Sequence, residues 1–290
     1  MKTIKFGSRD SRLAIIQAEM VMQTIAAPCE LITMKTTGDL ILDKTLAEIG
    51  GKGLFVKELD RALAAQEVDF TVHSLKDMPM EQPAGLPIVA YSKRADVRDA
   101  LVLAPNLDTL DFSKPIGCAS ARRRVQLKRL FPQATILPVR GNIQTRLHKL
   151  EQGQYGALVL AAAGLHRLGL ENRISRYFSP DEILPAAGQA IVAVQGREDS
   201  DCSCLVAFDD KEARVCALAE RSFVRTLDGG CSSPVAAYAT IQGTQLKLRG
   251  MYVNPQETII RYGNCTGDFA QAELLGIQLA NQLKRGECCE

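Results

Sequence analysis

The chain has 290 residues, of which 46% are hydrophobic and 23% charged, and its formal net charge at pH 7 is +2. This balance is typical of a soluble globular protein that can build a sizeable core, and the length favours two domains or three small ones. The pI near 8.0 and the aromatic content of 5% argue against a nucleic-acid binder, because few bases could stack on this surface.

Neither the N-terminal segment nor the apolar segments of the chain indicate export or membrane insertion. The N-terminal segment lacks an apolar stretch of signal-peptide length, and the longest apolar run, residues 157–165, is too short to span a bilayer. The nine cysteines are odd in number, and neither Cys202 with Cys204 nor Cys288 with Cys289 has a partner pair at zinc-finger spacing. We therefore expect a cytoplasmic protein with reduced thiols and no metal site.

The first two thirds of the chain alternate short apolar segments with longer amphipathic ones. Ser11 and Asn142 are suited to N-cap their helices, and Gly153 is suited to end the second of them. Alternating strands and helices of this length predict parallel sheets of the α/β class. In chain order we expect strand 3–8, helix 11–27, strand 29–36, helix 53–66, strands 68–74, 86–92, 99–104 and 115–120, helix 121–131, strand 134–140, helix 142–153 and strand 155–161.

The alternation of predicted strands and helices ends at about residue 210. A long amphipathic helix over 211–227 precedes three strand-like segments, 234–243, 245–253 and 258–267, and a helix over 269–286 closes the chain. Strands in direct succession pair antiparallel, so this part is predicted to be a separate α+β domain.

Arginines recur where predicted helices begin and predicted strands end. Loops at the carboxyl ends of strands converge on the ligand crevice of α/β proteins, and guanidinium groups suit bidentate binding of carboxylate or phosphate. Any single arginine can equally be a solvated surface charge, but their recurrence at strand ends predicts an anion site. The positions are Arg9, Arg122, Arg123, Arg124, Arg140, Arg146 and Arg167.

Two further segments carry reactive groups. "VHSLKDMP" places Lys76 and Asp77 just past a buried strand, where they form either a surface ion pair or a catalytic acid or base in a crevice. "RTLDGGCSSPV" holds Cys231 after two glycines in a tight turn, where the thiol is either incidental or reactive. By contrast, "GGKGLF" lacks the upstream glycine and the Ser or Thr of a phosphate-binding loop.

Together and in this order, eight segments resemble the porphobilinogen deaminase family, whose members are also called hydroxymethylbilane synthases. Any one segment is a weak signal, but eight in sequence, ending near residue 237, are very specific, and the last fifty residues match only in general pattern. The segments are "GSRDSRLAIIQA", "GGKGLFVKEL", "VHSLKDMP", "ASARRRVQL", "VRGNIQTRL", "LAAAGLHRLG", "LPAAGQ" and "ERSFVRTLDGGCSSPV".

The resemblance implies two lobes built like an anion-binding protein, with parallel-rich sheets, and a small C-terminal α+β domain with a three-stranded antiparallel sheet. It implies a transferase of porphyrin biosynthesis that deaminates four porphobilinogen molecules and joins them head to tail into hydroxymethylbilane. It further implies a cytoplasmic monomer that passes this product to the next pathway enzyme. We expect domain 1 over 1–92 plus 188–209, domain 2 over 93–187 and domain 3 over 210–290.

The resemblance also implies a dipyrromethane cofactor, made from the substrate and joined by a thioether to Cys231. A soft sulfur nucleophile suits this step, because loss of ammonia leaves a cationic azafulvene carbon. Asp77 matches the catalytic aspartate, whose carboxylate stabilises developing positive charge and can shuttle a proton. The family's cofactor- and substrate-binding residues match Arg9, Ser11, Lys76, Ser120, Arg122, Arg123, Arg140, Arg146 and Arg167, while Arg124 receives no role.

Four positions depart from the family pattern. Ala190 stands where a glycine is usual and Gln195 where a glutamate is common, and we expect both near the inter-domain hinge. Asp228 and Glu48 also replace the expected residues. None of the four removes a residue that the resemblance makes catalytic or anchoring.

A non-catalytic anion receptor is the competing interpretation, and a nucleic-acid binder would rest on the run of arginines alone. A receptor would use the arginines but has no need of Asp77 or of a thiol in a loop. The intact mass of the purified protein separates the two, because only the enzyme is expected to carry two pyrrole units.

Overall fold

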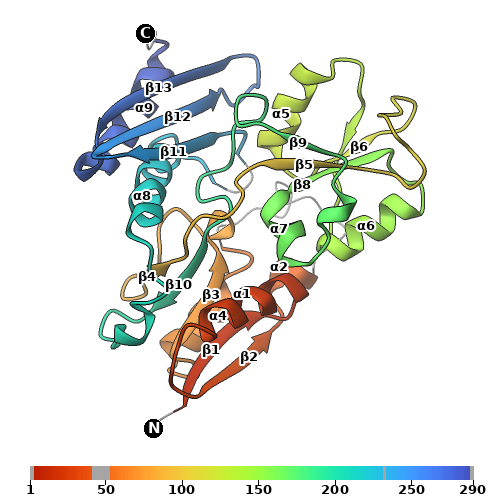
Figure 1. The fold of residues 1–290 in the computed structure, drawn as a ribbon. Helices are drawn as coiled ribbons and strands as arrows, with labels where there is room; N and C mark the ends of the chain where they lie inside the picture. The colour runs from red at the N-terminus through yellow and green to blue at the C-terminus, as the bar shows by residue number, and fades with distance from the viewer. Residues whose placement is uncertain (1–2, 41–52, 231–232, 288–290) are drawn as a thin grey trace.

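The computed structural model describes residues 3–40, 53–230 and 233–287, which form three β-sheets (Figure 1). Sheet A has the strand order β2-β1-β3-β10-β4, sheet B the order β7-β6-β8-β5-β9, and sheet C the order β11-β12-β13. The strands are β1 (Ile4–Arg9), β2 (Cys29–Met34), β3 (Phe70–Ser74), β4 (Ile88–Tyr91), β5 (Asp99–Leu103), β6 (Ile116–Gly117), β7 (Ile136–Leu137), β8 (Ala157–Ala161), β9 (Arg176–Phe178), β10 (Val192–Gly196), β11 (Ala236–Gln242), β12 (Gln245–Val253) and β13 (Ile260–Asp268).

Sheets A and B share one pattern of strand pairing. In sheet A, β1 pairs parallel with β2 and β3, while β10 pairs antiparallel with β3 and β4. In sheet B, β6 pairs parallel with β7 and β8, while β5 pairs antiparallel with β8 and β9. The predicted α/β class is confirmed, and each of these sheets also contains antiparallel pairs that the alternation of elements did not predict.

The helices begin and end where the local sequence allows. Ser11 caps α1 by accepting a hydrogen bond from Ala14 N (3.4 Å), and Asn142 caps α6 by accepting one from Thr145 N (2.9 Å), as predicted. The α-helices are α1 (Arg12–Met22), α2 (Thr37–Leu40), α4 (Lys57–Ala64), α5 (Ala121–Leu130), α6 (Ile143–Glu151), α7 (Ala162–Arg167), α8 (Lys211–Thr226) and α9 (Ala272–Arg285). The 3-10 turns are η1 (Leu75–Asp77), η2 (Glu171–Arg173), η3 (Ser203–Leu205) and η4 (Phe269–Gln271).

Sheet C is antiparallel throughout, as the direct succession of its strands predicts. Helices α8 and α9 bury their apolar faces against it, in a core that includes Phe223, Leu248 and Leu279. Figure 1 shows sheet C and α9 in blue, with α8, in teal, between sheet C and sheet A.

Two chain crossings connect sheets A and B: the first crossing, residues 92–98, runs from β4 to β5, and the second crossing, residues 179–191, runs from β9 to β10. The two crossings hydrogen-bond to each other. Ala95 N donates to Ala190 O (3.2 Å), and Gln189 Nε2 donates to Val97 O (2.7 Å). Gly188 has φ +70°, and a Cβ atom here would lie 2.6 Å from the Leu75 side chain, so the second crossing needs glycine at this point.

Glu220 of α8 joins the three sheets at a buried point. Its carboxylate accepts hydrogen bonds from Arg94 (2.8 Å) and Gly188 N (2.8 Å) on the two crossings, and from Ala239 N (2.7 Å) in β11. The side chain is fully buried, and burial raises the pKa of Glu220, although these bonds offset part of that shift. The same bonds hold α8 against both crossings.

Candidate active site

One cleft of about 750 Å³ contains all the described residues that the family resemblance assigns to the site. It is lined by residues from the ends of β1, β3 and β8, from the beginnings of α1, α5 and α6, from α7 and from the second crossing. The predicted site residues on its wall are Arg9, Ser11, Lys76, Asp77, Ser120, Arg122, Arg123, Arg140, Arg146 and Arg167.

Three helix N-termini face this cleft. The N-cap residues Ser11, Ser120 and Asn142 of α1, α5 and α6 all line it. Unpaired N–H groups and the helix dipole give each N-terminus a partial positive charge, which favours anions. The cleft is therefore suited to negatively charged ligands even before its side chains are counted.

The side chains add to this positive field. Among the described residues, nine basic side chains line the cleft against three acidic ones, Asp10, Asp39 and Asp77. A concave site with one dominant sign of charge raises the local concentration of oppositely charged ligands. The arrangement favours a ligand with several carboxylates or phosphates.

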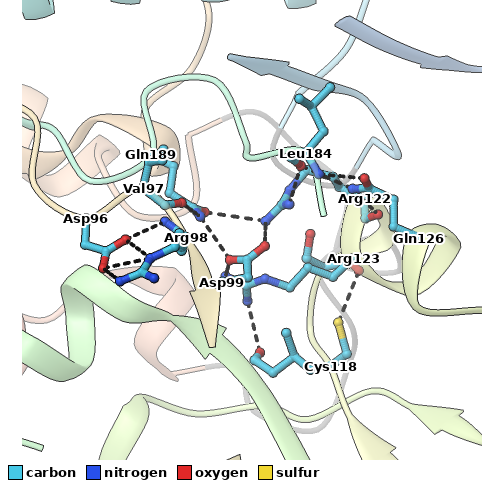
Figure 2. A network of polar contacts seen from close by, with 12 residues as sticks. Asp96, Val97, Arg98, Asp99, Cys118, Arg122, Arg123, Gln126, Leu184 and Gln189 are labelled. Atoms are coloured by element: carbon cyan, nitrogen blue, oxygen red, sulfur yellow. Dashed lines mark hydrogen bonds and ion pairs between the residues drawn. The ribbon is translucent and has the colours of Figure 1, made fainter. Parts of the chain in front are cut away.

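Arg122 and Arg123 are tied into a buried network centred on Asp99, which the sequence reading missed (Figure 2). Arg122 Nη2 lies 2.8 Å from Asp99 Oδ2, and Arg123 Nη2 donates to Asp99 Oδ1 (2.7 Å). Gln189 Nε2 donates to the same Oδ1 atom (2.9 Å), so the network joins sheet B to the second crossing. Burial alone would raise the pKa of Asp99, but the two guanidinium groups hold it well below its usual range.

Two of the predicted anion-binding arginines, Arg122 and Arg123, therefore also stabilise the fold. Each also donates to a backbone carbonyl, Arg122 to Leu184 O (2.6 Å) and Arg123 to Val159 O (3.1 Å). The neighbouring Arg124, which the pattern of arginines included but the family resemblance left without a role, is not part of the cleft lining. It is a partly exposed ion-pair partner of Glu257 in the β12–β13 turn.

Arg122→Leu is expected to lower the free energy of unfolding by about 3 kcal/mol, because it leaves the buried Asp99 carboxylate with one guanidinium partner instead of two. Arg124→Leu is the matched control on the same helix, and it should cost less than about 1 kcal/mol, since its ion pair is partly exposed. Urea unfolding of both variants measures the difference. Equal losses in the two proteins would contradict the structural role of the Asp99 network.

Three further arginines of the site are also held in place. Arg9 pairs with Asp39 and lies 4.4 Å from the centre of the Phe55 ring. Arg146 Nε donates to Gly141 O (2.8 Å), and Arg167 Nη2 donates to Ala190 O (2.9 Å) in the second crossing. Such contacts orient each guanidinium before a ligand arrives, which lowers the entropy lost on binding.

Lys76 and Asp77 follow β3 on the turn η1 and lie among these cations. Burial, aided by the nearby Arg123, lowers the pKa of Lys76 to about 8, while Asp77 and Asp99 oppose the shift. The Asp77 carboxylate acts electrostatically on Lys76, Arg123 and Arg146. It is thus a carboxylate inside a positively charged cleft, not one half of an isolated surface pair.

His73 lies beneath the site in β3, buried, with its Nε2 atom 2.9 Å from Thr71 Oγ1. Burial and the charge of Arg9 lower its pKa to about 4, so the imidazole is neutral at pH 7. His73 lies outside the lining of the cleft and has no proposed catalytic part.

Between pH 6.5 and pH 4 the unfolded chain protonates His73 while the folded chain does not, so folding stability should fall as the pH falls through this window. From pH 6.5 to pH 5 this one group should lower the free energy of unfolding by about 2 kcal/mol. In the His73→Gln protein, the loss of stability between these two pH values should be smaller by the same amount. Urea unfolding at both pH values measures it, and parallel losses in the two proteins would rule out the buried neutral histidine as the cause.

Glu48 and Cys231 lie outside the described residues. The neighbours of Cys231 in sequence, Gly230 and Ser233, both line the cleft, and Gly230 N donates to Ser233 Oγ (3.0 Å). The loop that carries the thiol therefore begins and ends at the cleft.

The other departures from the family pattern have separate surroundings. Ala190 lies in the second crossing with φ +72°, and Asp228 follows α8 with φ +54°, conformations that favour glycine. Gln195 lies inside β10, buried, and donates from Nε2 to Leu86 O (2.9 Å).

The structure is thus an α/β protein with two lobes of the same strand pairing, a cleft lined mainly by basic side chains and a small C-terminal antiparallel sheet. Two family models match the chain: "Porphobilinogen deaminase, dipyromethane cofactor binding domain" over residues 4–203, and "Porphobilinogen deaminase, C-terminal domain" over residues 214–285. The chain belongs to the porphobilinogen deaminase family. The second match extends the resemblance to the C-terminal part, where the sequence reading found only a general pattern.

Curated relatives agree over nearly the whole length. A porphobilinogen deaminase of Acetivibrio thermocellus is 54% identical over 288 residues, covering 98% of each chain. One of Ruminiclostridium cellulolyticum is 60% identical over 259 residues, covering 88% of each. Among solved structures, YhfZ from Shigella flexneri (TM-score 0.36, 15% identity) aligns over 80% of this chain and 94% of its own. A mutant of ArgBP from T. maritima (TM-score 0.38, 13% identity) aligns over 71% and 86%.

Proposed function

We propose that this chain deaminates porphobilinogen and joins four units head to tail into hydroxymethylbilane, on a dipyrromethane primer attached to Cys231. The observation that carries the proposal is the single cleft that unites Asp77 with the arginines named above and with both flanks of the Cys231 loop. A receptor for small anions would need the arginines but neither the carboxylate nor the thiol.

The described residues fit the cofactor. A dipyrromethane built from two substrate units carries four carboxylates, and the cleft offers an excess of cations together with three helix N-termini. Arg9, Arg122, Arg123, Arg140, Arg146 and Arg167 would hold these carboxylates, with Ser11 and Ser120 as hydroxyl partners. When bound, the group supplies the pyrrole carbon to which substrate is joined.

The chain's own residues then have distinct tasks. The arginines and Lys76 bind the acetate and propionate groups and orient the pyrrole rings within reach of Asp77. The Asp77 carboxylate stabilises the positive charge that develops on substrate as ammonia leaves, and its oxygens can accept and return the proton of the coupling step.

We propose three domains with the ranges 1–92 plus 188–209, 93–187 and 210–290. Each sheet falls within one of these ranges, and the two crossings, with Ala190 in the second, are the proposed hinge. Arg167 supports this hinge position, because it contacts the carbonyl of Ala190 from the far lobe.

Further points stay predictions from the family resemblance: a transferase that acts as a monomer in the cytoplasm and passes hydroxymethylbilane to the next enzyme of porphyrin biosynthesis. The six described cysteines are free thiols, which is compatible with a reducing compartment. No helix within the described residues is long and apolar enough to cross a membrane. Gel filtration of the purified protein tests the monomer.

The function is tested by intact mass and by turnover. The purified protein should carry the added mass of two pyrrole units and should release one ammonia for each porphobilinogen consumed, with hydroxymethylbilane as the product. An unmodified chain that binds porphobilinogen without releasing ammonia would instead support a receptor.

A further inference from the structure

Two basic residues of the cleft wall, Arg12 and Lys35, lie outside the set that the family resemblance assigns. Arg12 is the first residue of α1, and Lys35 directly follows β2. Strands β1 and β2 pair in parallel with Arg9 opposite Met34, and Asp10 N donates to Met34 O (3.2 Å). Both cations therefore stand at the same carboxyl edge of sheet A, beside the substrate cleft.

Their surroundings differ from those of the inner arginines. Arg9, Arg122 and Arg123 are paired with carboxylates, and Arg146 and Arg167 donate to backbone carbonyls. Arg12 and Lys35 are exposed, and within residues 3–40, 53–230 and 233–287 neither side chain makes an ion pair or a hydrogen bond. Among the described residues, no carboxylate therefore neutralises these two charges, and both are exposed to a ligand that enters the cleft.

The position of Arg12 is unfavourable for the helix that it begins. A helix N-terminus favours acidic side chains, and a cation there costs about 0.3–1 kcal/mol. The first turn of α1 holds no acidic residue that would offset this cost, and Asp10, just before the cap, makes no ion pair with Arg12 in the described structure. Residues that destabilise their own helix are typical of functional sites, where a ligand supplies the missing interaction.

We propose that Arg12 and Lys35 form a capture pair at the rim of the cleft, which attracts the carboxylates of incoming porphobilinogen and guides it toward the inner arginines. This inference rests on the proposed function. The two are positioning residues for substrate entry, because the reacting groups are assigned to the inner cleft. Exposed charges act over a Debye length and are screened by salt, so their effect should appear in the rate of association.

The test compares two double variants that remove the same charge. Arg12→Gln/Lys35→Gln removes the capture pair, and Lys211→Gln/Lys247→Gln removes two exposed lysines outside the cleft, the first of which also begins a helix, α8. At about 10 mM ionic strength, kcat/KM for porphobilinogen should fall about three- to ten-fold in the capture-pair variant only. kcat should change less than about two-fold, and the difference should vanish near 0.5 M salt, where the Debye length is only a few Å.

A conservative pair separates charge from shape. Arg12→Lys/Lys35→Arg keeps both charges and should retain the kcat/KM of the parent protein at low salt. Should the double glutamine variant fail to fold, Arg12→Gln and Lys35→Gln singly provide the same salt-dependent comparison.

Equal kcat/KM values for the capture-pair and control variants at low salt would overturn the inference. So would a fall in kcat with unchanged KM, since it would place the two residues in the chemistry instead of in entry. A parent protein that releases no ammonia from porphobilinogen would overturn the proposed function itself, which is a distinct result.

Discussion

The Asp77→Asn protein is expected to fold normally and to turn over porphobilinogen about 10²–10⁴-fold more slowly than the parent. The amide keeps the size of the carboxylate, so the arginines can still hold pyrrole carboxylates. What disappears is the negative charge that stabilises the cationic state in every round of deamination and coupling. Single-turnover kinetics, with mass analysis of the enzyme-bound species, should reveal part-built chains that are hardly released.

Asp10→Asn is the matched control, because Asp10 lines the same cleft and also loses one negative charge. It should stay within a few-fold of the parent rate, since no reacting group is assigned to it. Near-normal turnover by Asp77→Asn would falsify the central role of this carboxylate and would direct attention to Lys76, whose pKa of about 8 also allows proton transfer.

Cys231→Ser is expected to abolish covalent attachment of pyrrole units and, with it, measurable activity. A neutral hydroxyl is a far poorer nucleophile than a thiolate toward the cationic carbon left by the departing ammonia. The intact mass of the variant should be that of the bare chain.

The other thiols provide the controls for this experiment. Burial raises the pKa of Cys216 to about 12, which leaves almost no thiolate at neutral pH, and Cys265 is half-buried in β13. Cys216→Ser and Cys265→Ser should each keep the full added mass. A Cys231→Ser protein that still carries two pyrrole units on either residue would show that the attachment site is misplaced.

Most of the predicted helices and strands were confirmed, because the spacing of apolar residues and the capping residues that mark them are local in sequence. The helix over 121–131 and the strand over 99–104 match α5 and β5 to within one residue. The helix expected over 11–27 ends at Met22. The prediction was too long because apolar residues at helical spacing continue past Met22, where the chain already turns back toward sheet A. Strand β10 was missed, although it is fully buried between β3 and β4. Its segment follows a long irregular crossing and carries no alternation of apolar and polar residues.

The sequence by itself determined the family, the α/β class and ten residues of the cleft wall. Those conclusions rest on short motifs and on the spacing of apolar residues in helices and strands. Both are local properties, because they depend only on residues that are close in sequence. Only the tertiary structure decided how the cations are used. Asp99 is 23 residues from Arg122 in sequence, and nothing local marks it as the partner that makes this arginine structural. Likewise, Arg12 and Lys35 look like ordinary surface charges until the parallel pairing of β1 and β2 brings both to the rim of one cleft. Ion pairs depend on distances in space, and those distances exist only once the sheets have formed.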